Sequence, residues 1–551
     1  MQKRKFKILL IFPPVWTPET PYLSTPTLTA WLRKKGWDVS QMDLNIEFWY
    51  HFYDEKKIIE MAQKAFTKYR ELAKLQTLSL QQRDMMEKIR QFARQVIKGE
   101  IDAEIFHYIC TQFGGFSYIE GIDKKPAHYP WESPQKYHDR FFEDISYSAY
   151  GMASSDIYEM LNNEKLNPYF EFFEKYGIQN ILEHTPNLVG ISVIALNQVI
   201  PAFTLSKVIK KHLPETYVVL GGAWCSHLFD VLPHKLELFD VVDSVVVFEG
   251  EEALEKLAHA IKSGTEPRDV PNLIHRRRDK IVSTKIEADI DLNTLATPEF
   301  DGLPLSKYWN VGVLPLQTSR GCYWAKCSFC SYRILEPKYK LRKLELVIDD
   351  IERLRRKYNA EEICFVDACM EPERLKELSK LLLDRKIDIK WMCMGRFDRR
   401  LTGDILELMS KAGCWRIVWG LESGSMKILQ YLRKGTYLKD IERILRDAAN
   451  VGINNRVCLM YGYPIETWED AMATVNFIEN NLKHIESITY TYFTPERHTE
   501  IVYEREKFKL KLVNDGKDLA IGYRHNTLLK PDELKEIEKR LNLICEKLEK
   551  R

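Results

Sequence analysis

Two regions of the chain alternate short apolar runs with amphipathic stretches. In the first region the apolar runs predict strands, which fall at 6–12, 37–43, 188–195, 217–220 and 240–248. Helical patterns lie between or after these runs, at 27–35, 199–212 and 252–262. Strands that alternate with helices are typical of a parallel sheet with helices on its faces. The predicted fold class is therefore α/β, with a Rossmann-like, doubly wound first domain formed by residues 1–48 and 183–265.

The segment between the two halves of this domain, residues 49–182, has a different character. Residues 52–110 are rich in Lys, Glu, Gln, Met and Ala with helical periodicity, whereas residues 111–180 are irregular and rich in aromatic residues. We interpret 49–182 as a mostly helical insertion. Its aromatic side chains either line a substrate cavity or form the core of a small helical subdomain. They are Phe113, Phe116, Tyr118, Tyr129, Trp131 and Tyr137.

The second β/α region begins near residue 311. Its six predicted strands are 311–318, 362–367, 388–394, 415–420, 454–461 and 486–493. Its helical patterns are 342–358, 372–385, 401–413, 437–451 and 467–481. This alternation predicts a partial parallel (β/α)6 barrel over residues 308–500. We interpret residues 266–307 as a linker with a hairpin around Arg278 and Asp279, and residues 501–551 as a C-terminal helical extension.

Composition and charge narrow the classes of function. The formal net charge of +2 gives no global field that favours nucleic acid or an anionic membrane, so neither is expected as a partner. No run approaches the ~18 apolar residues of a membrane-spanning helix. Pro13 and Pro14 interrupt the apolar N-terminal run too early for a signal peptide. The expected location is the cytoplasm, where most of the 11 cysteines are small, reduced core residues.

Three cysteines form one tight group. Cys322, Cys327 and Cys330 follow the first strand of the second region, on the face where parallel barrels place their chemistry. Gly321 allows the backbone to bend sharply before them. Three thiolates are one ligand short of the usual set for a [4Fe–4S] cluster, so one iron is left open to bind another molecule. The alternatives are chance clustering and a structural zinc site, for which no nearby Cys or His supplies the fourth ligand.

This loop resembles that of the radical S-adenosylmethionine (radical SAM) superfamily. The usual pattern there is Cys-x3-Cys-x2-Cys with an aromatic residue before the last cysteine, a place that Phe329 occupies here. The first spacing is four residues in this chain rather than three, which argues against the most common subgroups. The resemblance implies a [4Fe–4S] cluster on Cys322, Cys327 and Cys330, S-adenosylmethionine as a cofactor, and an electron donor such as flavodoxin or ferredoxin.

The resemblance covers roughly residues 310–495. It implies that Asp367, which ends the second strand, contacts the amino group of S-adenosylmethionine, and that Arg396, after the third strand, meets its carboxylate. Glu422 and Ser423 belong to a Gly-x-Glu-Ser turn of the family after the fourth strand. Taken singly, an arginine at a strand end is more often a surface ion pair, and an acidic residue there more often a helix cap. Two further stretches that match the family are 434–436 and 462–467.

Residues 1–48 and 183–265 resemble the cobalamin-binding domain that precedes the radical core in one large class of this superfamily. Ligands of such open sheets bind outside the carboxyl ends of the strands. The motif Asp-x-His-x-x-Gly is absent, so no imidazole is expected under the cobalt from the loop after the first strand. The alternative is a vestigial domain without cobalamin. The residues expected near the corrin are Pro13, Tyr22, Asn197, Gln198, Gly221, Gly222, Trp224, Glu249 and Gly250.

These resemblances imply an enzyme that cleaves S-adenosylmethionine reductively and acts on an unactivated carbon. With cobalamin, methyl transfer is the simplest outcome, and a rearrangement or cyclisation would use the same cofactors. The alternatives are a radical SAM enzyme without cobalamin and a non-catalytic cobalamin- or metal-binding protein. A methylthiotransferase is disfavoured because the first 109 residues hold no cysteine for a second cluster. The expected substrate is a small metabolite or a peptide.

Overall fold

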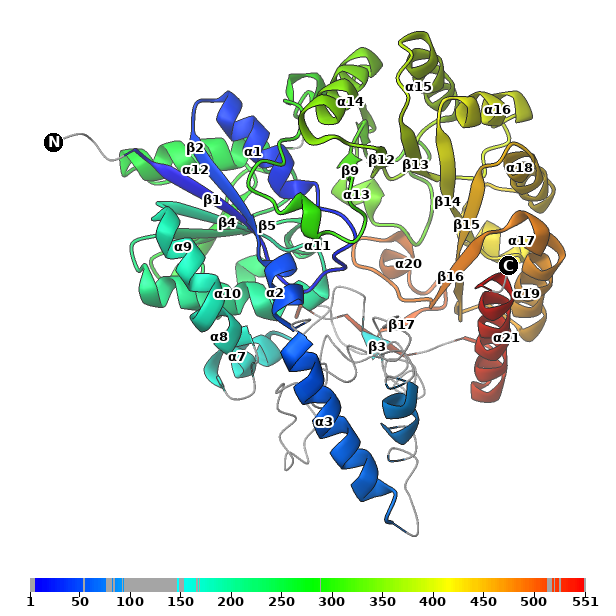
Figure 1. The fold of residues 1–551 in the computed structure, drawn as a ribbon, viewed down its shortest axis with the longest axis horizontal. Coiled ribbons are helices and arrows are strands. Elements are labelled where there is room, and N and C mark those ends of the chain that lie inside the picture. The colour runs from blue at the N-terminus through cyan, green and yellow to red at the C-terminus, as the bar shows by residue number, and fades with distance from the viewer. Residues whose placement is uncertain are drawn as a thin grey trace.

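The computed structural model describes residues 5–52, 55–75, 82, 85–91, 93, 146–147, 153–164, 167, 169–287, 289–512, 518–519, 521–524 and 527–549. Figure 1 shows two α/β bodies beside each other, one for each region of alternating pattern. The predicted fold class is confirmed. No helix among these residues is long and apolar enough to cross a membrane.

The first sheet has, within the described residues, seven strands in the order β2-β1-β4-β5-β6-β7-β8. Its parallel strands are β1 (Lys7–Phe12), β2 (Asp38–Asp43), β4 (Leu188–Ser192), β5 (Tyr217–Gly221) and β6 (Ser244–Val246). The order of these five strands, 2-1-3-4-5 along the chain, is that of a doubly wound sheet. The expected Rossmann-like organisation is therefore confirmed.

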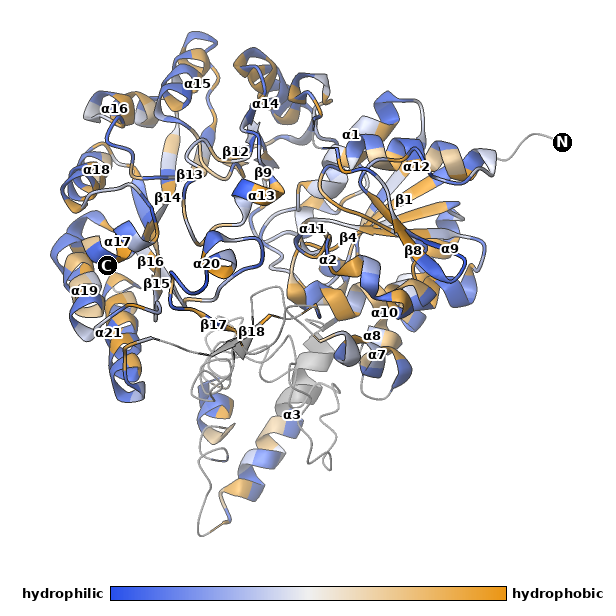
Figure 2. Ribbon diagram, turned by 180° about the vertical axis from the view of Figure 1, so that it is seen from behind, coloured by the Kyte–Doolittle hydropathy of each residue, from blue (hydrophilic) through white to orange (hydrophobic). Residues whose placement is uncertain are grey.

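Helices cover both faces of this sheet because its strands carry apolar side chains on both sides. Leu9 and Ile11 of β1 pack with α10 (Val199–His212), whereas Ile8 and Leu10 pack with α1 (Ser24–Lys34) and α12 (Glu251–Ser263). Neighbouring residues of a strand point to opposite faces, so one apolar run supplies both cores. Figure 2 shows the apolar strands enclosed by helices.

Part of the predicted linker belongs to this sheet. β7 (Leu273–Arg277) pairs antiparallel with β6, and β8 (Lys280–Ser283) pairs with β7 around the predicted turn. The hairpin was expected, but its addition to the first sheet was not. The predicted strand at 240–248 is also shorter than expected, because a 3-10 helix occupies Leu236–Asp240.

The described part of the insertion is largely helical. Its helices are α2 (Leu44–Phe52), α3 (Glu55–Leu72), α7 (Ser154–Asn162), α8 (Tyr169–Phe172), a π-helix (Phe173–Gly177) and α9 (Ile178–His184). Phe170 and Phe173 pack into the same core as α10. The six aromatic residues between 113 and 137 that suggested a cavity or a subdomain core lie outside the described residues.

The second body is an open barrel. In the described chain its six strands are all parallel, in the order β16-β15-β14-β13-β12-β9. They are β9 (Val313–Leu316), β12 (Glu362–Phe365), β13 (Lys390–Gly395), β14 (Cys414–Glu422), β15 (Asn454–Tyr461) and β16 (Ser487–Tyr492). The helices that follow them are α14 (Leu344–Tyr358), α15 (Pro372–Asp384), α16 (Gly403–Lys411), α18 (Leu438–Asn450) and α19 (Trp468–Asn481). The predicted partial (β/α)6 barrel is confirmed.

The C-terminal segment is not only helical. α21 (Pro531–Glu549) is helical as predicted, and it packs on the barrel. Before it, β17 (Lys511–Leu512) and β18 (Gly522–Arg524) form a small sheet with β3 (Ser146–Tyr147) of the insertion. Leu519 is fully buried in the core of the first body. The segment therefore ties the insertion and both sheets together.

Candidate active site

The cysteine loop leaves the carboxyl end of β9. Gly321, at φ +81°, bends the backbone immediately before Cys322. A Cβ atom at this position would lie 2.7 Å from the carbonyl oxygen of Lys338, so the loop needs glycine here. Cys322, Cys327 and Cys330 are free thiols of intermediate exposure.

The three thiols lie within electrostatic range of one another. Burial raises the pKa of Cys330 to about 12, and the neighbouring Cys327 and Cys322 also raise it. Burial likewise raises the pKa of Cys327, which Lys434 lowers and Cys322 raises. Charges act on one another in this way only when they lie close together. The structure thus brings the three predicted cysteines together beside the ammonium of Lys434.

Among the described residues, no group of three or more His, Cys, Asp or Glu side chains is placed to hold a single metal ion. A structural zinc ion requires four ligands around one point. In a four-iron cluster each cysteine binds its own iron, so the sulfurs need not converge as closely. The cluster on these three thiols stays a prediction from their spacing along the chain.

A buried ion pair lies next to the cysteine loop. Nζ of Lys434 is 2.7 Å from Oε1 of Glu422, and the two side chains are only 10% and 11% exposed. Burial disfavours the charged form of Lys434, but Glu422 outweighs this effect and raises the pKa of the ammonium. The ring centroid of Phe329 lies 5.8 Å from the same Nζ, so Phe329 forms part of the wall around the pair.

Arg396 lies beside this pair. Its guanidinium stacks 3.9 Å from the ring centroid of Trp324. Its Nη2 donates to the carbonyl oxygens of Lys434 and Gly435, at 2.7 and 2.9 Å. Its Nε is buried without a hydrogen-bond partner. An orphaned guanidinium donor fits an anionic group such as a carboxylate, which is the role that the resemblance implies for Arg396.

The polar groups of two other predicted residues form hydrogen bonds within the protein. The carboxylate of Asp367 accepts from the amide and hydroxyl of Thr318, at 3.0 and 2.9 Å, and from the hydroxyl of Ser319 at 2.5 Å. With 1% exposure, Asp367 anchors the base of the cysteine loop, and its geometry does not support a contact with S-adenosylmethionine. Ser423 is fully buried, and its hydroxyl lies 3.0 Å from that of Thr474, so it shapes the turn after β14.

At the carboxyl edge of the first sheet, Gln198 ties two loops together. Its amide nitrogen donates to the carbonyl oxygen of Pro13 at 2.7 Å, and its amide oxygen accepts from the backbone of Ile194 at 2.9 Å. Tyr22 stacks on Phe12 with 5.2 Å between the ring centroids. The amide of Gln198 therefore has little capacity left for a ligand.

Four further predicted residues at this edge differ from one another. Gly222, at φ +107°, has no room for a side chain, because a Cβ atom would lie 2.4 Å from the carbonyl oxygen of Val193. Trp224 is fully buried in the core and packs edge-on against Phe203 at 6.1 Å, which does not agree with its expected place beside a corrin. Oδ1 of Asn197 is buried without a partner and could bind a ligand. At position 221 a Cβ atom would fit without a clash, so the available space does not require glycine there.

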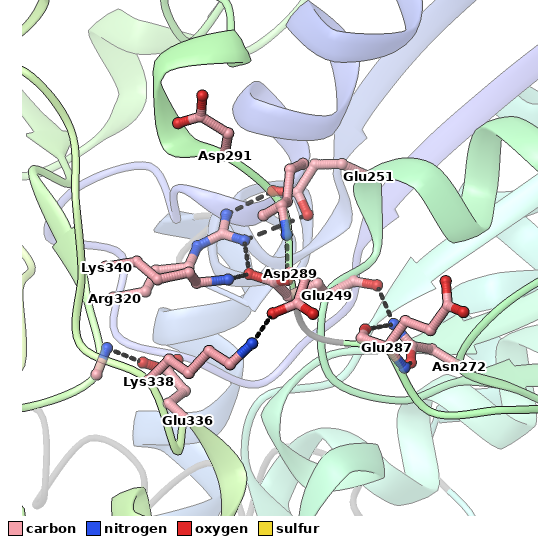
Figure 3. Close-up of polar contacts among 12 residues, drawn as sticks. Glu249, Glu251, Asn272, Glu287, Asp289, Asp291, Arg320, Glu336, Lys338 and Lys340 are labelled. Carbon is pink, nitrogen blue, oxygen red and sulfur yellow. Dashed lines mark hydrogen bonds and ion pairs between the residues drawn. The ribbon is translucent and has the colours of Figure 1, made fainter.

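Glu249 lies in an ion-pair network between the two bodies (Figure 3). Its Oε1 accepts from Nη1 of Arg320 at 3.0 Å and from Lys340. Its Oε2 accepts from the amide of Ile290 at 3.1 Å. Because both oxygens are in use, Glu249 holds the cysteine loop rather than an open ligand site. Gly250 beside it packs against Leu28.

Glu251 is the second carboxylate that pairs with Arg320. Its Oε1 lies 2.5 Å from Nη2 of Arg320, and the Glu251 side chain is 4% exposed. Burial disfavours ionisation of Glu251, but Arg320 outweighs this and lowers the pKa of the carboxyl. Since Arg320 is two residues before Cys322, the turn between β6 and α12 is fastened directly to the cysteine loop.

The carboxyl edges of the two sheets therefore face each other. α11 (Ala223–His227), which follows β5, lies between the bodies near the cysteine loop and α20 (Glu500–Tyr503) (Figures 1 and 2). Nε2 of His227 is 3.1 Å from the hydroxyl of Ser331, the residue after Cys330. The amide of Trp309 donates to the carbonyl oxygen of Pro18 at 3.0 Å. Loops of both sheets thus meet on the side that carries the cysteines.

A pocket of about 570 Å³ opens against the cysteine loop. Its lining includes Lys326, Arg333 and Arg433 together with Thr436 and the exposed Tyr437. Glu500 pairs with Arg433 at 2.6 Å and with Arg333 at 3.6 Å, whereas Lys326 lies over the Trp324 ring. The charged side chains that line this pocket are all basic.

Some residues of this site lie in motifs that the sequence analysis identified, but no role was assigned to them there. Trp324 lies inside the cysteine motif, and Lys434 lies in a stretch that matches the family. His227, Ser331 and Glu496 carried no signal, because they come from three distant parts of the chain. Only the folded structure brings them together.

Residues 316–478 match the sequence model of the radical SAM superfamily. This part of the chain is a radical SAM domain. It runs from the end of β9 into α19 and includes the cysteine loop, Arg396, Glu422 and Lys434. Membership supports S-adenosylmethionine and a [4Fe–4S] cluster as cofactors of the domain, as the resemblance implied.

Curated relatives of the radical SAM protein include methyltransferases. An uncharacterized methyltransferase of Pyrococcus horikoshii is 26% identical over 58% of this chain and 70% of its own length. The cytidylyl-2-hydroxyethylphosphonate methyltransferase of Streptomyces wedmorensis is 23% identical over 56% of this chain and 66% of its own length. The chain thus spans about two thirds of each relative.

Two solved structures share the fold over nearly the whole chain. The cobalamin-dependent S-adenosylmethionine radical enzyme OxsB, with aqua-cobalamin and S-adenosylmethionine bound, superposes with a TM-score of 0.62 at 16% identity. That match covers 97% of this chain and 66% of OxsB. The radical S-adenosylmethionine methyltransferase TsrM of Kitasatospora setae, with cobalamin and a [4Fe–4S] cluster bound, gives 0.57 at 18% identity, covering 93% and 81%. At these identities the likeness shows the fold alone.

Proposed function

We propose that this radical SAM protein uses cobalamin to transfer a methyl group to an unactivated carbon of a small metabolite or a peptide. The observation that carries the proposal is the meeting of the two carboxyl edges, which sets the loops of the first sheet against the three-cysteine loop. Two curated relatives named as methyltransferases and two similar structures that contain cobalamin support it.

The roles proposed for the barrel residues follow from their contacts. Cys322, Cys327 and Cys330 would hold the cluster. Arg396, with its free buried Nε, would bind the carboxylate of S-adenosylmethionine, and the Glu422–Lys434 pair would fix the neighbouring wall. When bound, the cluster and S-adenosylmethionine supply a 5′-deoxyadenosyl radical, the strong hydrogen-abstracting species that an unactivated carbon requires.

The first sheet offers cobalamin a limited set of contacts. Asn197 has an unpartnered buried oxygen at the edge, and Gly222 keeps the backbone free of a side chain there. The ring nitrogens of His227 are both engaged, by Ala223 and Ser331, so His227 is not offered as a cobalt ligand. The engagement of Gln198 and Glu249 favours the second candidate, a radical SAM enzyme without cobalamin. A bound corrinoid spectrum separates the two.

The partner proposals rest on the surface beside the cysteine loop. The cationic pocket around Lys326, Arg333 and Arg433 suits an acidic electron donor such as flavodoxin or ferredoxin. A cytoplasmic location and the absence of nucleic-acid and membrane partners stay predictions from composition.

The test is anaerobic reconstitution with iron and sulfide, followed by incubation with S-adenosylmethionine and a reductant. Mass analysis should detect 5′-deoxyadenosine with the wild type and none when Cys322, Cys327 and Cys330 are all replaced by Ala. Cys545→Ala, a half-buried cysteine of α21, is the matched control and should behave as wild type. Cleavage by the triple variant, or stoichiometric zinc in the purified wild type, would overturn the proposal.

A further inference from the structure

The inner face of the open barrel can be separated from its outer face by the pattern of each strand. Successive residues of a strand point to opposite faces of a sheet. On β12 to β15 the outer face shares a core with the surrounding helices (Figure 1). Its residues include Phe365, Cys393, Ile417 and Val457. Their neighbours along the strands therefore point to the inner face. These neighbours are Val366, Met394, Val418 and Arg456.

The strand register places these four inner residues in one row. Met394 is paired with Val418, and Val418 with Arg456. Val366 lies one residue beyond the last pair of β12 and β13, next to Met394. Met394 is 47% exposed and Val366 is 38% exposed, and Arg456 is exposed as well. An accessible apolar surface and a guanidinium thus meet on adjacent strands inside the barrel.

The guanidinium of Arg456 is held in place but is not neutralised. Its Nε and Nη2 donate to the hydroxyl oxygen of Thr489 on β16, at 3.2 and 3.0 Å. No Asp or Glu of the described chain forms an ion pair with it, whereas Arg416 on the next strand pairs with Glu486 at 2.7 Å. Nη1 and one hydrogen of Nη2 are left to donate, and the hydroxyl of Thr489 keeps its own hydrogen. Donors arranged in this way fit a carboxylate.

The strand itself sets the length of a molecule that could bind here. Met460, on the same face of β15, packs with the apolar cluster that also contacts Phe329 of the cysteine loop. Four residues separate Arg456 from Met460, which is about 13 Å along an extended strand. Burial raises the pKa of the Cys458 thiol between them, Glu422 also raises it and Arg456 lowers it. A molecule held at Arg456 reaches the cysteine loop only with an apolar body of about this length.

An arginine that meets only water is the simpler interpretation of Arg456. Water would satisfy the guanidinium, but it would leave the neighbouring valine and methionine side chains in contact with solvent, which is unfavourable. A ligand with an apolar body and an anionic group covers both surfaces at once, as in sites where a few polar groups orient a mostly apolar molecule. The row of inner residues therefore favours such a ligand.

We propose that Arg456 binds a carboxylate of the substrate inside the barrel, and that Val366, Met394 and Val418 contact its apolar body. The inference rests on the proposed function and deepens it, because it names the class of substrate as an acid with an extended apolar part. One guanidinium matches the single charge of a carboxylate. The carbon that receives the methyl group then lies at the far end of the molecule, toward the cysteine loop.

Calorimetric titration of the full-length protein with octanoate and with 1-octanol tests the proposal. S-adenosylmethionine is present throughout, so that it occupies the carboxylate site proposed at Arg396. The two probes share an apolar chain and differ in the carboxylate, so the wild type should bind octanoate about tenfold or more tightly than octanol. Arg456→Gln should abolish this preference. Arg456→Lys, which keeps the charge but not the guanidinium fork, should retain part of it.

Two further variants complete the test. Arg446→Gln is the matched control, because this arginine of α18 is 55% exposed and pairs with Asp447, and the preference for octanoate should be unchanged. Met394→Asn should weaken the binding of both probes by a similar factor, because it removes apolar contact without changing the charge at Arg456.

Equal affinities of the wild type for the two probes, or a preference that survives in Arg456→Gln, would overturn the carboxylate site. Unchanged affinities in Met394→Asn would overturn the apolar wall. The titrations contain no reductant and detect no reaction product, so their result does not depend on cleavage of S-adenosylmethionine. A failure of the proposed function appears instead in the 5′-deoxyadenosine assay.

Discussion

Arg320→Met removes the one guanidinium that neutralises two carboxylates between the sheets. Arg320 and Glu249 are 13% and 14% exposed, and Glu251 is 4% exposed. Removal of one partner from a buried ion pair costs about 3–5 kcal/mol, because a charge is left uncompensated in a dry environment. We expect a loss of free energy of unfolding in this range at pH 7, seen as a lower midpoint in urea.

The stability difference between wild type and Arg320→Met should also change with pH in a definite direction. The folded-state pKa of Glu251 is lowered, so the wild type keeps this stabilisation above the ordinary value of 4.5 and loses it as the pH falls further. In Arg320→Met, burial acts without the guanidinium and raises the pKa of Glu251. The carboxyl then takes up a proton in mildly acidic solution, and the deficit relative to wild type should shrink between pH 7 and pH 5.

Two variants make the test decisive. Adding Glu251→Gln to Arg320→Met removes the stranded charge and should recover part of the loss. Lys338→Met breaks the neighbouring Lys338–Asp289 pair, in which the two side chains are 62% and 70% exposed, and should cost far less than Arg320→Met because water screens exposed charges. The reasoning is refuted if Arg320→Met costs no more than Lys338→Met, or if the double variant is no more stable than the single one.

Three further changes test other parts of the account. Gly222→Ala should lower the free energy of unfolding by about 3 kcal/mol or more, measured by thermal unfolding. The loss should clearly exceed that of Gly36→Ala, because Gly36 has φ +83° but open space around a Cβ atom. Equal losses would rule out the clash with Val193. Burial raises the pKa of Glu466 to about 8, so the free energy of unfolding of the wild type should fall as the pH rises from about 5 to 9. That of Glu466→Gln should not fall in this way, and parallel curves of stability against pH for the two proteins would contradict the prediction. Arg396→Lys should weaken binding of S-adenosylmethionine about tenfold or more in calorimetry because the guanidinium fork is lost, whereas Arg416→Lys, which pairs with Glu486 away from the site, should not.

The sequence predicted those features that depend on neighbours along the chain. Apolar runs such as 188–195 become buried strands because a strand between two helical layers has no polar face. The cysteine loop was predictable because its three thiols lie within nine residues of one another. The partial barrel followed from the same alternation of strands and helices.

Other features depend on contacts between distant residues and left no local pattern. Arg320 meets Glu249 and Glu251 across about 70 residues, so a glutamate that resembled a cofactor ligand proved to be an ion-pair partner. Trp224 follows a strand end, as ligand residues do, but its ring turns into the core beside Phe203. The contact between His227 and Ser331 requires the two sheets to be docked before it exists.

Retention of a corrinoid by the reconstituted protein tests the central claim most directly. The account predicts that the full chain, loaded with iron, sulfide and hydroxocobalamin and then desalted, keeps about one corrinoid together with its cluster. The absorption spectrum should not be that of a corrinoid whose cobalt is coordinated by an imidazole. The loop after β1 contains no histidine, and both ring nitrogens of His227 are engaged. A protein that keeps its full complement of iron but releases all of the corrinoid would contradict the account and favour a radical SAM enzyme without cobalamin.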